Sequence, residues 1–339
     1  TARPLLEQRA YELSDALIYA EALSLLPQNR ASADQVKEEL APYWWKSATS
    51  NHHDMITGTS PDEVIYEESF PWLEESLVEV EKVIERLSEG LEEPDVAQVE
   101  ATLPDYRFHN DDRTLTVRTQ YYEAVLSEEH GGAIIRLTTL DGAALITEPS
   151  SDLVCYRDSG GLWRMGHEFK GGKLKLTDTA SQTPATMTVE KTPEGLAVHT
   201  THQLHGETIR RTTWFRDNAP EIRCRVSGKA AARHTVNVRL HPRLAFKALH
   251  MDAAGGVVTR SPKRVYDPTY WPFQHVVHLE AGDHAMAVLQ KYPGAIAYQP
   301  KDGWVELVAL RNATKERAWG IVPILANPAK GEVRDPYDF

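Results

Sequence analysis

Apolar residues in the first quarter of the chain recur at the spacing of an amphipathic helix. Between Leu5 and Leu26 they stand three or four positions apart, at 6, 10, 13, 17, 20 and 23, which predicts one helix over this range. A second pattern of the same period follows Ser32, which we expect to form a capping box with Gln35. This second pattern contains Pro42, and we expect the helix to bend there because proline cannot donate a backbone hydrogen bond.

A third helical pattern begins at Ser60, a strong N-cap candidate, with Pro61 at the first helical position. The pattern continues to Leu87, and Pro71 is expected either to bend this helix or to divide it. Three helices joined by short loops predict an antiparallel three-helix bundle over residues 1–95. The outward positions of the third helix indicate a solvated acidic face, made of Glu67, Glu68, Glu74, Glu75, Glu79, Glu81 and Glu85.

Beyond about residue 96 the apolar period changes from near 3.6 to 2, which is the period of a β-strand. Short runs of β-branched and apolar residues lie between turn signals such as Asp141-Gly142 and His205-Gly206. The clearest runs cover residues 114–117, 133–137, 187–189, 196–198 and 305–308. The chain is therefore predicted to be a multi-domain α and β protein, with a large antiparallel β-sandwich over residues 96–339.

The charge of the chain excludes some classes of partner. The 339 residues carry a formal net charge of −12, and no segment supplies the basic face that nucleic acid or an anionic membrane needs. No apolar run approaches the roughly 20 residues of a membrane span. A neutral ligand fits this composition better, and we expect no nucleic-acid partner and no membrane partner.

The two cysteines, Cys155 and Cys224, cannot form a disulfide framework in a chain of this size. We interpret them as reduced thiols in the core, which suits a cytoplasmic protein. A single buried bridge between them is the alternative. The first residue is Thr1 and the N-terminus has no signal-peptide pattern, so we expect the chain to begin within a longer gene product.

The most specific chemical signal is the triplet His52-His53-Asp54. It places two imidazoles and a carboxylate within one turn of backbone, as in a metal ligand with its orienting partner. The bland alternative is a pair of helix-end histidines bonded to nearby carbonyls. Adjacent side chains diverge around a helix, so we expect only one of the two histidines to face a given metal. At least two further ligands must come from elsewhere, because one triplet cannot build a tetrahedral site.

Three other stretches hold candidate chemistry. His199 and His202 look like metal ligands, but on a strand they are expected to face opposite sides of the sheet. The glycine-rich stretch 158–168 lacks the strand-to-helix context of a phosphate loop, and we interpret it as a structured loop. Tyr270 and Trp271 lie in a loop punctuated by proline, where exposed rings could stack on a sugar. Packing between domains is the alternative for these rings.

The stretch His52-His53-Asp54-Met55-Ile56-Thr57-Gly58-Thr59 resembles the motif of class II α-mannosidases, family 38 of the glycoside hydrolases. Other segments match the same family in order. Thr1-Ala2-Arg3-Pro4 is similar to the segment that closes its catalytic barrel, with alanine in place of serine. Ala20-Glu21-Ala22 and Asp158-Ser159-Gly160-Gly161-Leu162-Trp163 are weaker matches. The resemblance covers nearly the whole chain.

The resemblance implies the central three-helix domain of these enzymes followed by much of their β-domain, a supersandwich of the galactose mutarotase type. It leaves open whether this domain is complete at its C-terminal end. It implies retaining hydrolysis of terminal α-mannosyl residues at a zinc ion. The nucleophile, the acid/base and other zinc ligands lie in an N-terminal barrel that this chain lacks. By motif correspondence His53 is a zinc ligand and Asp54 supports the site, whereas His52 does not map to a ligand. The chain alone is therefore predicted to be inactive.

Two other functions remain open. The chain could be a non-catalytic carbohydrate-binding module, in which Tyr270 and Trp271 contact an oligosaccharide. It could also be a scaffold that only holds subunits together, and enzymes of the family are often homo-oligomers. The sequence does not indicate which mannosidic linkage a parent enzyme prefers.

Overall fold

The fold was analysed in a computed structural model of the chain. It divides into two compact units, one holding the α-helices and one holding the β-strands, and each is described by itself. The structure describes residues 4–53, 55–56, 60, 63–91, 101–161, 165–166, 174–246, 248–253, 255–260, 269–281, 284–299, 302–313 and 337–338.

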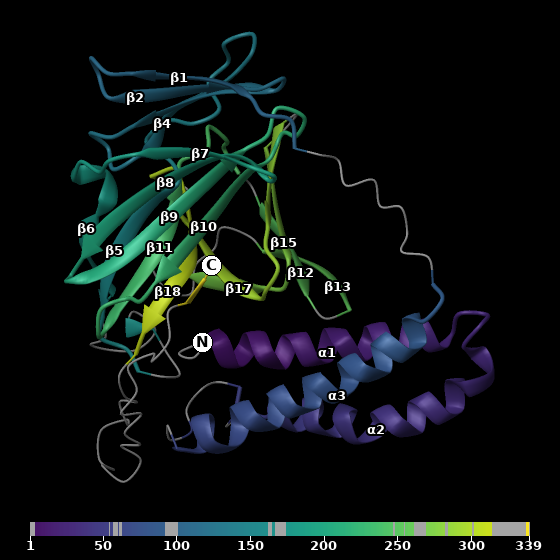
Figure 1. The fold of residues 1–339 in the computed structure, drawn as a ribbon. Coiled ribbons are helices and arrows are strands. Elements are labelled where there is room, and N and C mark those ends of the chain that lie inside the picture. The colour runs from purple at the N-terminus through teal and green to yellow at the C-terminus, as the bar shows by residue number, and fades with distance from the viewer. Residues whose placement is uncertain are drawn as a thin grey trace, which may run out of the picture. The chain divides into compact units, whose positions relative to one another are not determined.

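The helical unit is built from three α-helices, as the apolar spacing predicts (Figure 1). They are α1 (Pro4–Ser24), α2 (Ala33–Ser50) and α3 (Phe70–Ser88). Their apolar stripes meet in one core, because residues three and four apart lie on one helix face. The fully buried members of this core include Leu13, Leu17, Leu40, Leu73 and Val80. The three-helix part of the fold prediction is confirmed.

The helix ends differ in part from the prediction. The capping box does not form, because the Ser32 hydroxyl donates to the Asn29 carbonyl oxygen at 2.9 Å instead of capping α2. Pro42 lies inside α2. Pro71 lies at the start of α3, and a short π-helix over Val64–Ser69 precedes that helix. The third helical pattern is therefore divided near Pro71, which was one of the two outcomes expected for this proline. The predicted first turn at Pro61 lies outside the described residues.

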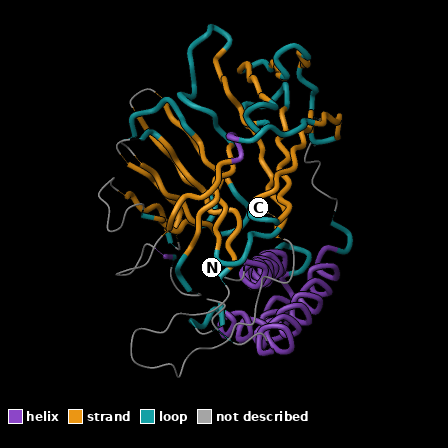
Figure 2. The backbone as a smooth tube through the Cα atoms, turned by 90° about the vertical axis from the view of Figure 1, so that its left-hand side faces the viewer, coloured by secondary structure: helices purple, strands orange, loops and turns teal. Residues whose placement is uncertain are grey.

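The second unit consists of antiparallel strands in four sheets (Figures 1 and 2). One four-stranded sheet has the order β1 (Asp105–His109), β2 (Thr114–Arg118), β3 (Tyr122–Ser127), β4 (Ala133–Thr139). The other has the order β13 (Gly256–Arg260), β12 (Ala248–Ala253), β15 (Val276–Ala281), β16 (His284–Leu289).

The two larger sheets are built from the remaining strands, which come from both before and after β12 in the chain. The five-stranded sheet has the order β19 (Tyr337–Asp338), β10 (Ile222–Gly228), β9 (Glu207–Phe215), β8 (Gly195–Leu204), β7 (Thr188–Thr192). The six-stranded sheet has the order β14 (Tyr270–Phe273), β17 (Gly294–Gln299), β18 (Trp304–Asn312), β11 (His234–Leu240), β5 (Asp152–Asp158), β6 (Leu174–Thr179).

Packed layers hold this unit together (Figure 2). One face of the five-stranded sheet is shared between two cores. At one end of β8, Leu196 and Val198 pack with Leu115 of β2. At the other end, Leu204 packs with Val236 of the six-stranded sheet. Every second residue of β8 is thus buried, which follows from the two-residue period of a strand, and the predicted antiparallel β-sandwich is confirmed.

A buried arginine joins three parts of the unit. The Arg211 guanidinium is fully enclosed and donates to the carbonyl oxygens of Gly131, at 2.7 Å, and of Ser151. Gly131 has a φ of +60°, and a Cβ there would lie 2.4 Å from the Ala180 carbonyl oxygen, so glycine is required. Arg211 therefore connects β9 with the β3–β4 turn and with the start of β5.

Candidate functional site

The histidine pair lies in the turn that ends α2. The amide group of Asn51 donates to the Ser47 carbonyl oxygen at 2.9 Å and so closes the helix end. Beyond it, the carbonyl oxygen of His52 accepts hydrogen bonds from the backbone N–H groups of Met55, at 2.9 Å, and Ile56, at 3.1 Å. His52 and His53 are both exposed. The local backbone thus holds two imidazoles at the surface of the helical unit.

The two rings lie side by side rather than apart. Their centroids are 4.1 Å from each other and the ring planes are inclined by 35°. The expectation that these adjacent side chains diverge is therefore wrong. It assumed helical backbone, whereas α2 ends at Ser50 and residues 51–53 form a turn. Both imidazole rings are therefore exposed to solvent in the same region of the surface.

The described residues of the turn do not form a metal site by themselves. Asp54 and residues 57–59 of the motif lie outside the described residues. Within the described ranges, no group of three or more histidine, cysteine, aspartate or glutamate side chains could hold a metal ion. The exposed His53 ring fits zinc as one nitrogen ligand of a site, since a neutral imidazole is a common zinc ligand. The other ligands must then come from outside the described residues.

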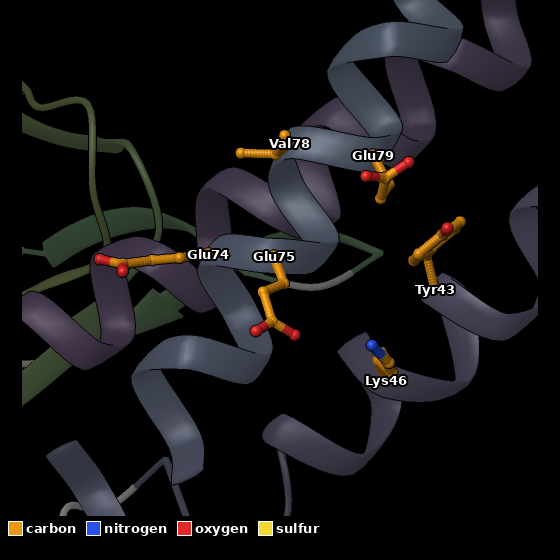
Figure 3. A pocket seen from close by; sticks show the side chains of 6 residues that line it. All are labelled: Tyr43, Lys46, Glu74, Glu75, Val78 and Glu79. Atoms are coloured by element: carbon orange, nitrogen blue, oxygen red, sulfur yellow. The ribbon is translucent and has the colours of Figure 1, made fainter. Parts of the chain in front are cut away.

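A groove between α2 and α3 has a volume of about 480 Å³ (Figure 3). Glu79 extends from α3 toward Tyr43 on α2, and Lys46 lies on the same wall as Tyr43 (Figure 3). Two of the three glutamates that line the groove have partners, because Glu79 pairs with Lys82 at 2.6 Å and Glu74 lies 3.7 Å from Arg9. This groove is part of the acidic face of α3, and its pairing indicates a solvated surface.

The densest polar network lies in the six-stranded sheet. The fully buried Glu306 carboxylate accepts hydrogen bonds from Tyr156 Oη, Arg239 Nε and Asn237 Nδ2, each at 2.7 Å, and from Tyr270 Oη at 3.2 Å. Burial, with the carboxylate beside it, raises the pKa of the Tyr156 hydroxyl. Four donors saturate a carboxylate, so this network stabilises the fold and leaves Glu306 no lone pair for a substrate.

Sequence reasoning missed this network. Its members sit at alternate positions of strands that are otherwise apolar, as Asn237 does between the core residues Val236 and Val238. A polar residue within an otherwise apolar strand was the signal that the sequence offered. This signal does not tell which polar residues bind one another, because Tyr156 and Glu306 are 150 positions apart in the chain.

The two aromatics predicted as sugar contacts lie in a strand and not in a loop. Residues Tyr270–Phe273 form β14 at the edge of the six-stranded sheet, which tolerates Pro272 because an edge strand has one unpaired side. Successive side chains of a strand face opposite sides. Tyr270 accordingly joins the Glu306 network, while Trp271 packs against the opposite core with the Arg260 guanidinium 4.7 Å from its ring centroid. The two rings do not form one platform.

The glycine-rich stretch is held by an aspartate at the end of β5. The Asp158 carboxylate accepts hydrogen bonds from the backbone N–H groups of Gly160, at 2.7 Å, and Gly166, at 2.6 Å. It also accepts one from Arg311 Nε at 2.8 Å. These contacts agree with a structured loop, and most of residues 162–173 lie outside the described ranges.

His199 and His202 face opposite sides of β8, as predicted. His199 is half-buried and its Nδ1 lies 2.9 Å from Thr212 Oγ1, whereas His202 is buried with Nε2 3.0 Å from Thr200 Oγ1. Burial, reinforced by the charge of Arg211, lowers the pKa of His202 to about 4. The pair therefore cannot share a metal ion.

Neither cysteine is in a disulfide. Cys155 is buried and Cys224 is half-buried, and both thiols are free. Burial raises the pKa of the Cys155 thiol to about 11, which keeps it protonated and unreactive at neutral pH. No helix among the described residues combines the length and the apolar character that a membrane crossing requires.

Two solved structures share this fold over the whole chain. One is a protein in the glycosyl hydrolase family 38 from Enterococcus faecalis, with a TM-score of 0.69 and 12% identity, covering 100% of this chain and 56% of that chain. The other is an alpha-mannosidase from Enterococcus faecalis V583, with a TM-score of 0.69 and 10% identity, covering 100% of this chain and 54% of that chain. The chain thus spans just over half the length of each.

Other comparisons add little. A match to a galactose mutarotase-like protein from Clostridium acetobutylicum covers 61% of this chain and 88% of that chain at 8% identity, but its TM-score of 0.33 is too low to indicate a shared fold. No family model matches the chain, and no curated protein matches its sequence. What the comparisons establish is the architecture: the chain has the fold of the corresponding part of glycosyl hydrolase family 38 structures, as the resemblance implied.

Proposed function

We propose that the chain is the helical and β-sandwich part of a zinc-dependent retaining α-mannosidase that acts on terminal α-mannosyl residues of glycans. His53 supplies one zinc ligand, Asp54 supports it, and the helical unit forms a wall of the active site. The remaining ligands, the nucleophile and the acid/base belong to an N-terminal barrel outside this chain. We place the enzyme in the cytoplasm.

One observation carries this proposal: His53 is exposed in a fixed turn, and the chain shares its fold with family 38 structures of nearly twice its length. A ring enclosed in the bundle core could not reach a metal held by another domain. The exposed ring can do so without any change in the bundle. In the described part of the β unit, the buried carboxylates of Glu306 and Asp158 are taken up by Arg239 and Arg311.

The chemistry of the chain's own residues follows from this placement. His53 coordinates as a neutral imidazole through one ring nitrogen. The neighbouring His52 ring limits the space in which the His53 ring can turn, because the two centroids are 4.1 Å apart. Zinc, if held by His53 together with ligands from outside the described residues, would supply electrostatic stabilisation of the charge that develops as the glycosidic bond breaks.

Turnover of a chromogenic α-mannoside tests the proposal. In the complete enzyme we expect His53→Ala to lower kcat/KM at least about 100-fold, since loss of a ligand exceeds the cost of losing a supporting contact. His130→Ala, at another exposed histidine in a turn of the β unit, is the matched control and should leave kcat/KM unchanged. Turnover by the isolated 339-residue chain would refute the proposal.

A further inference from the structure

Strand β1 is an edge strand that lacks two of the usual protections, a proline and a β-bulge. It pairs with β2 through a regular five-residue register, and no other described strand pairs with it (Figure 1). Its sequence, Asp105-Tyr106-Arg107-Phe108-His109, contains no lysine, proline or glycine and no bulge. Native edge strands are commonly protected by such features. By contrast, the edge strand β14 contains such a proline, Pro272.

The inner face of β1 continues an apolar layer beyond the edge of the sheet. Tyr106 and Phe108 stand opposite Val117 and Leu115 in the register, so they share the face that packs on the five-stranded sheet. Val117 and Leu115 are 0% exposed, whereas Tyr106 is 41% and Phe108 36% exposed. Two aromatic rings are therefore left half-covered beside a row of unpaired backbone groups.

The outer face of β1 is complementary to itself. Asp105 and Arg107 precede and follow Tyr106 in the chain, so their side chains lie on the outer face, and both are exposed. When two copies of the strand pair antiparallel about an axis through Tyr106, each Asp105 lies opposite Arg107 of the other copy. An axis through Arg107 would instead place two guanidinium groups opposite each other, and an axis through Phe108 would pair Arg107 with His109. Of these registers, only the first places a carboxylate opposite a guanidinium. The second sets Asp105 opposite His109, but it has two guanidinium groups opposed at its centre.

We propose that β1 pairs with β1 of a second copy of this chain in this register. The four-stranded sheet then continues across a two-fold axis as an isologous interface. Asp105 would lie between Arg118 of its own chain, its neighbour in the β1–β2 register, and the partner's Arg107. On the inner face the two Tyr106 rings cover each other. Nothing in this surface involves the turn at His53, so it stands independently of the proposed activity.

Sedimentation of the complete 339-residue chain over a concentration series tests the pairing. We expect a dimer that dissociates between about 10 µM and 1 mM, because one short strand pair buries an area at the low end of specific interfaces. Arg107→Asp, which places like charges opposite each other twice, should raise the dissociation constant at least about tenfold. The charge swap Asp105→Arg with Arg107→Asp should restore it. Arg136→Asp, on β4 of the same sheet, is the control that changes nothing.

Disulfide trapping tests the register without relying on charge. Tyr106→Cys places two thiols directly opposite across the axis, and mild oxidation should give a crosslinked dimer. His109→Cys lies three residues away on the same strand and should not crosslink. A chain that stays monomeric throughout the series, an Arg107→Asp variant as dimeric as the unaltered chain, or equal crosslinking at both positions would each overturn the proposal.

Discussion

The two units differ in whether their main polar groups lie at the surface or in the interior. In the helical unit the core is apolar and the histidine pair lies in an exposed turn. In the β unit the strongest polar groups are inside, where Glu306 holds Arg239 and Asp158 holds Arg311. Both carboxylates have a counter-charge and further hydrogen bonds. The exposed imidazoles lie outside the core of their unit.

This difference separates residues that serve the fold from residues available for chemistry. A buried charge must be compensated within the protein, because its desolvation costs several kcal/mol. Once compensated, it has little capacity left for a ligand. An exposed imidazole carries no such cost. The density of polar groups is thus greatest where we expect no catalysis.

The largest effect should come from breaking the buried network. Glu306→Ala leaves the Arg239 guanidinium without its counter-charge, and we expect it to lower the free energy of unfolding of the β unit by about 4 kcal/mol. Urea denaturation measures this change. Glu123→Ala removes a carboxylate that pairs with Arg118 and Arg136 at the surface, and should cost less than about 1 kcal/mol. Equal losses in the two variants would contradict the division drawn above.

Acid should weaken the β unit through His202. Its folded pKa of about 4 lies below the ordinary value of 6.5, so the unfolded chain binds a proton more readily. Stability due to neutral His202 is therefore complete above about pH 6.5 and falls as the pH drops toward 4, by about 3 kcal/mol in total. His202→Gln should flatten this part of the pH profile in urea denaturation. His199→Gln, on the opposite face of β8, should keep the steeper profile.

Surface ion pairs of the helical unit should matter least. Arg86 and Glu39 form two hydrogen bonds at 2.6 and 3.2 Å between α3 and α2, but both side chains are exposed. We expect Glu39→Ala to cost less than about 1 kcal/mol, and the loss should shrink in 1 M salt. Thermal unfolding with and without salt checks this. A larger cost that persists in salt would show that the outside of the bundle also serves the fold.

Local patterns were sufficient to predict most elements and insufficient for the tertiary contacts of polar groups. The bundle could be predicted because residues such as Leu13 and Leu17 repeat at helical spacing within one segment. The edge strand β14 could not, since Pro272 interrupts its pattern and only the edge position makes it acceptable. The Glu306 network required pairing strands far apart in the chain, which no local pattern specifies.

The candidate site shows the same limit. The motif identified His53, and the structure adds that its ring is exposed and lies against the His52 ring. The stacking could not be predicted from sequence, because it depends on α2 ending at Ser50 so that a turn, and not a helix, carries the pair. Sequence reasoning therefore named the candidate residues and misjudged the geometry around them.

The zinc content of the complete enzyme tests the central claim most directly. Metal analysis after dialysis should find about one zinc per chain in the unaltered enzyme and in His52→Ala, and little or none in His53→Ala. All three proteins should unfold at the same urea concentration, since neither ring is part of the bundle core. Full zinc retention in His53→Ala would contradict the account.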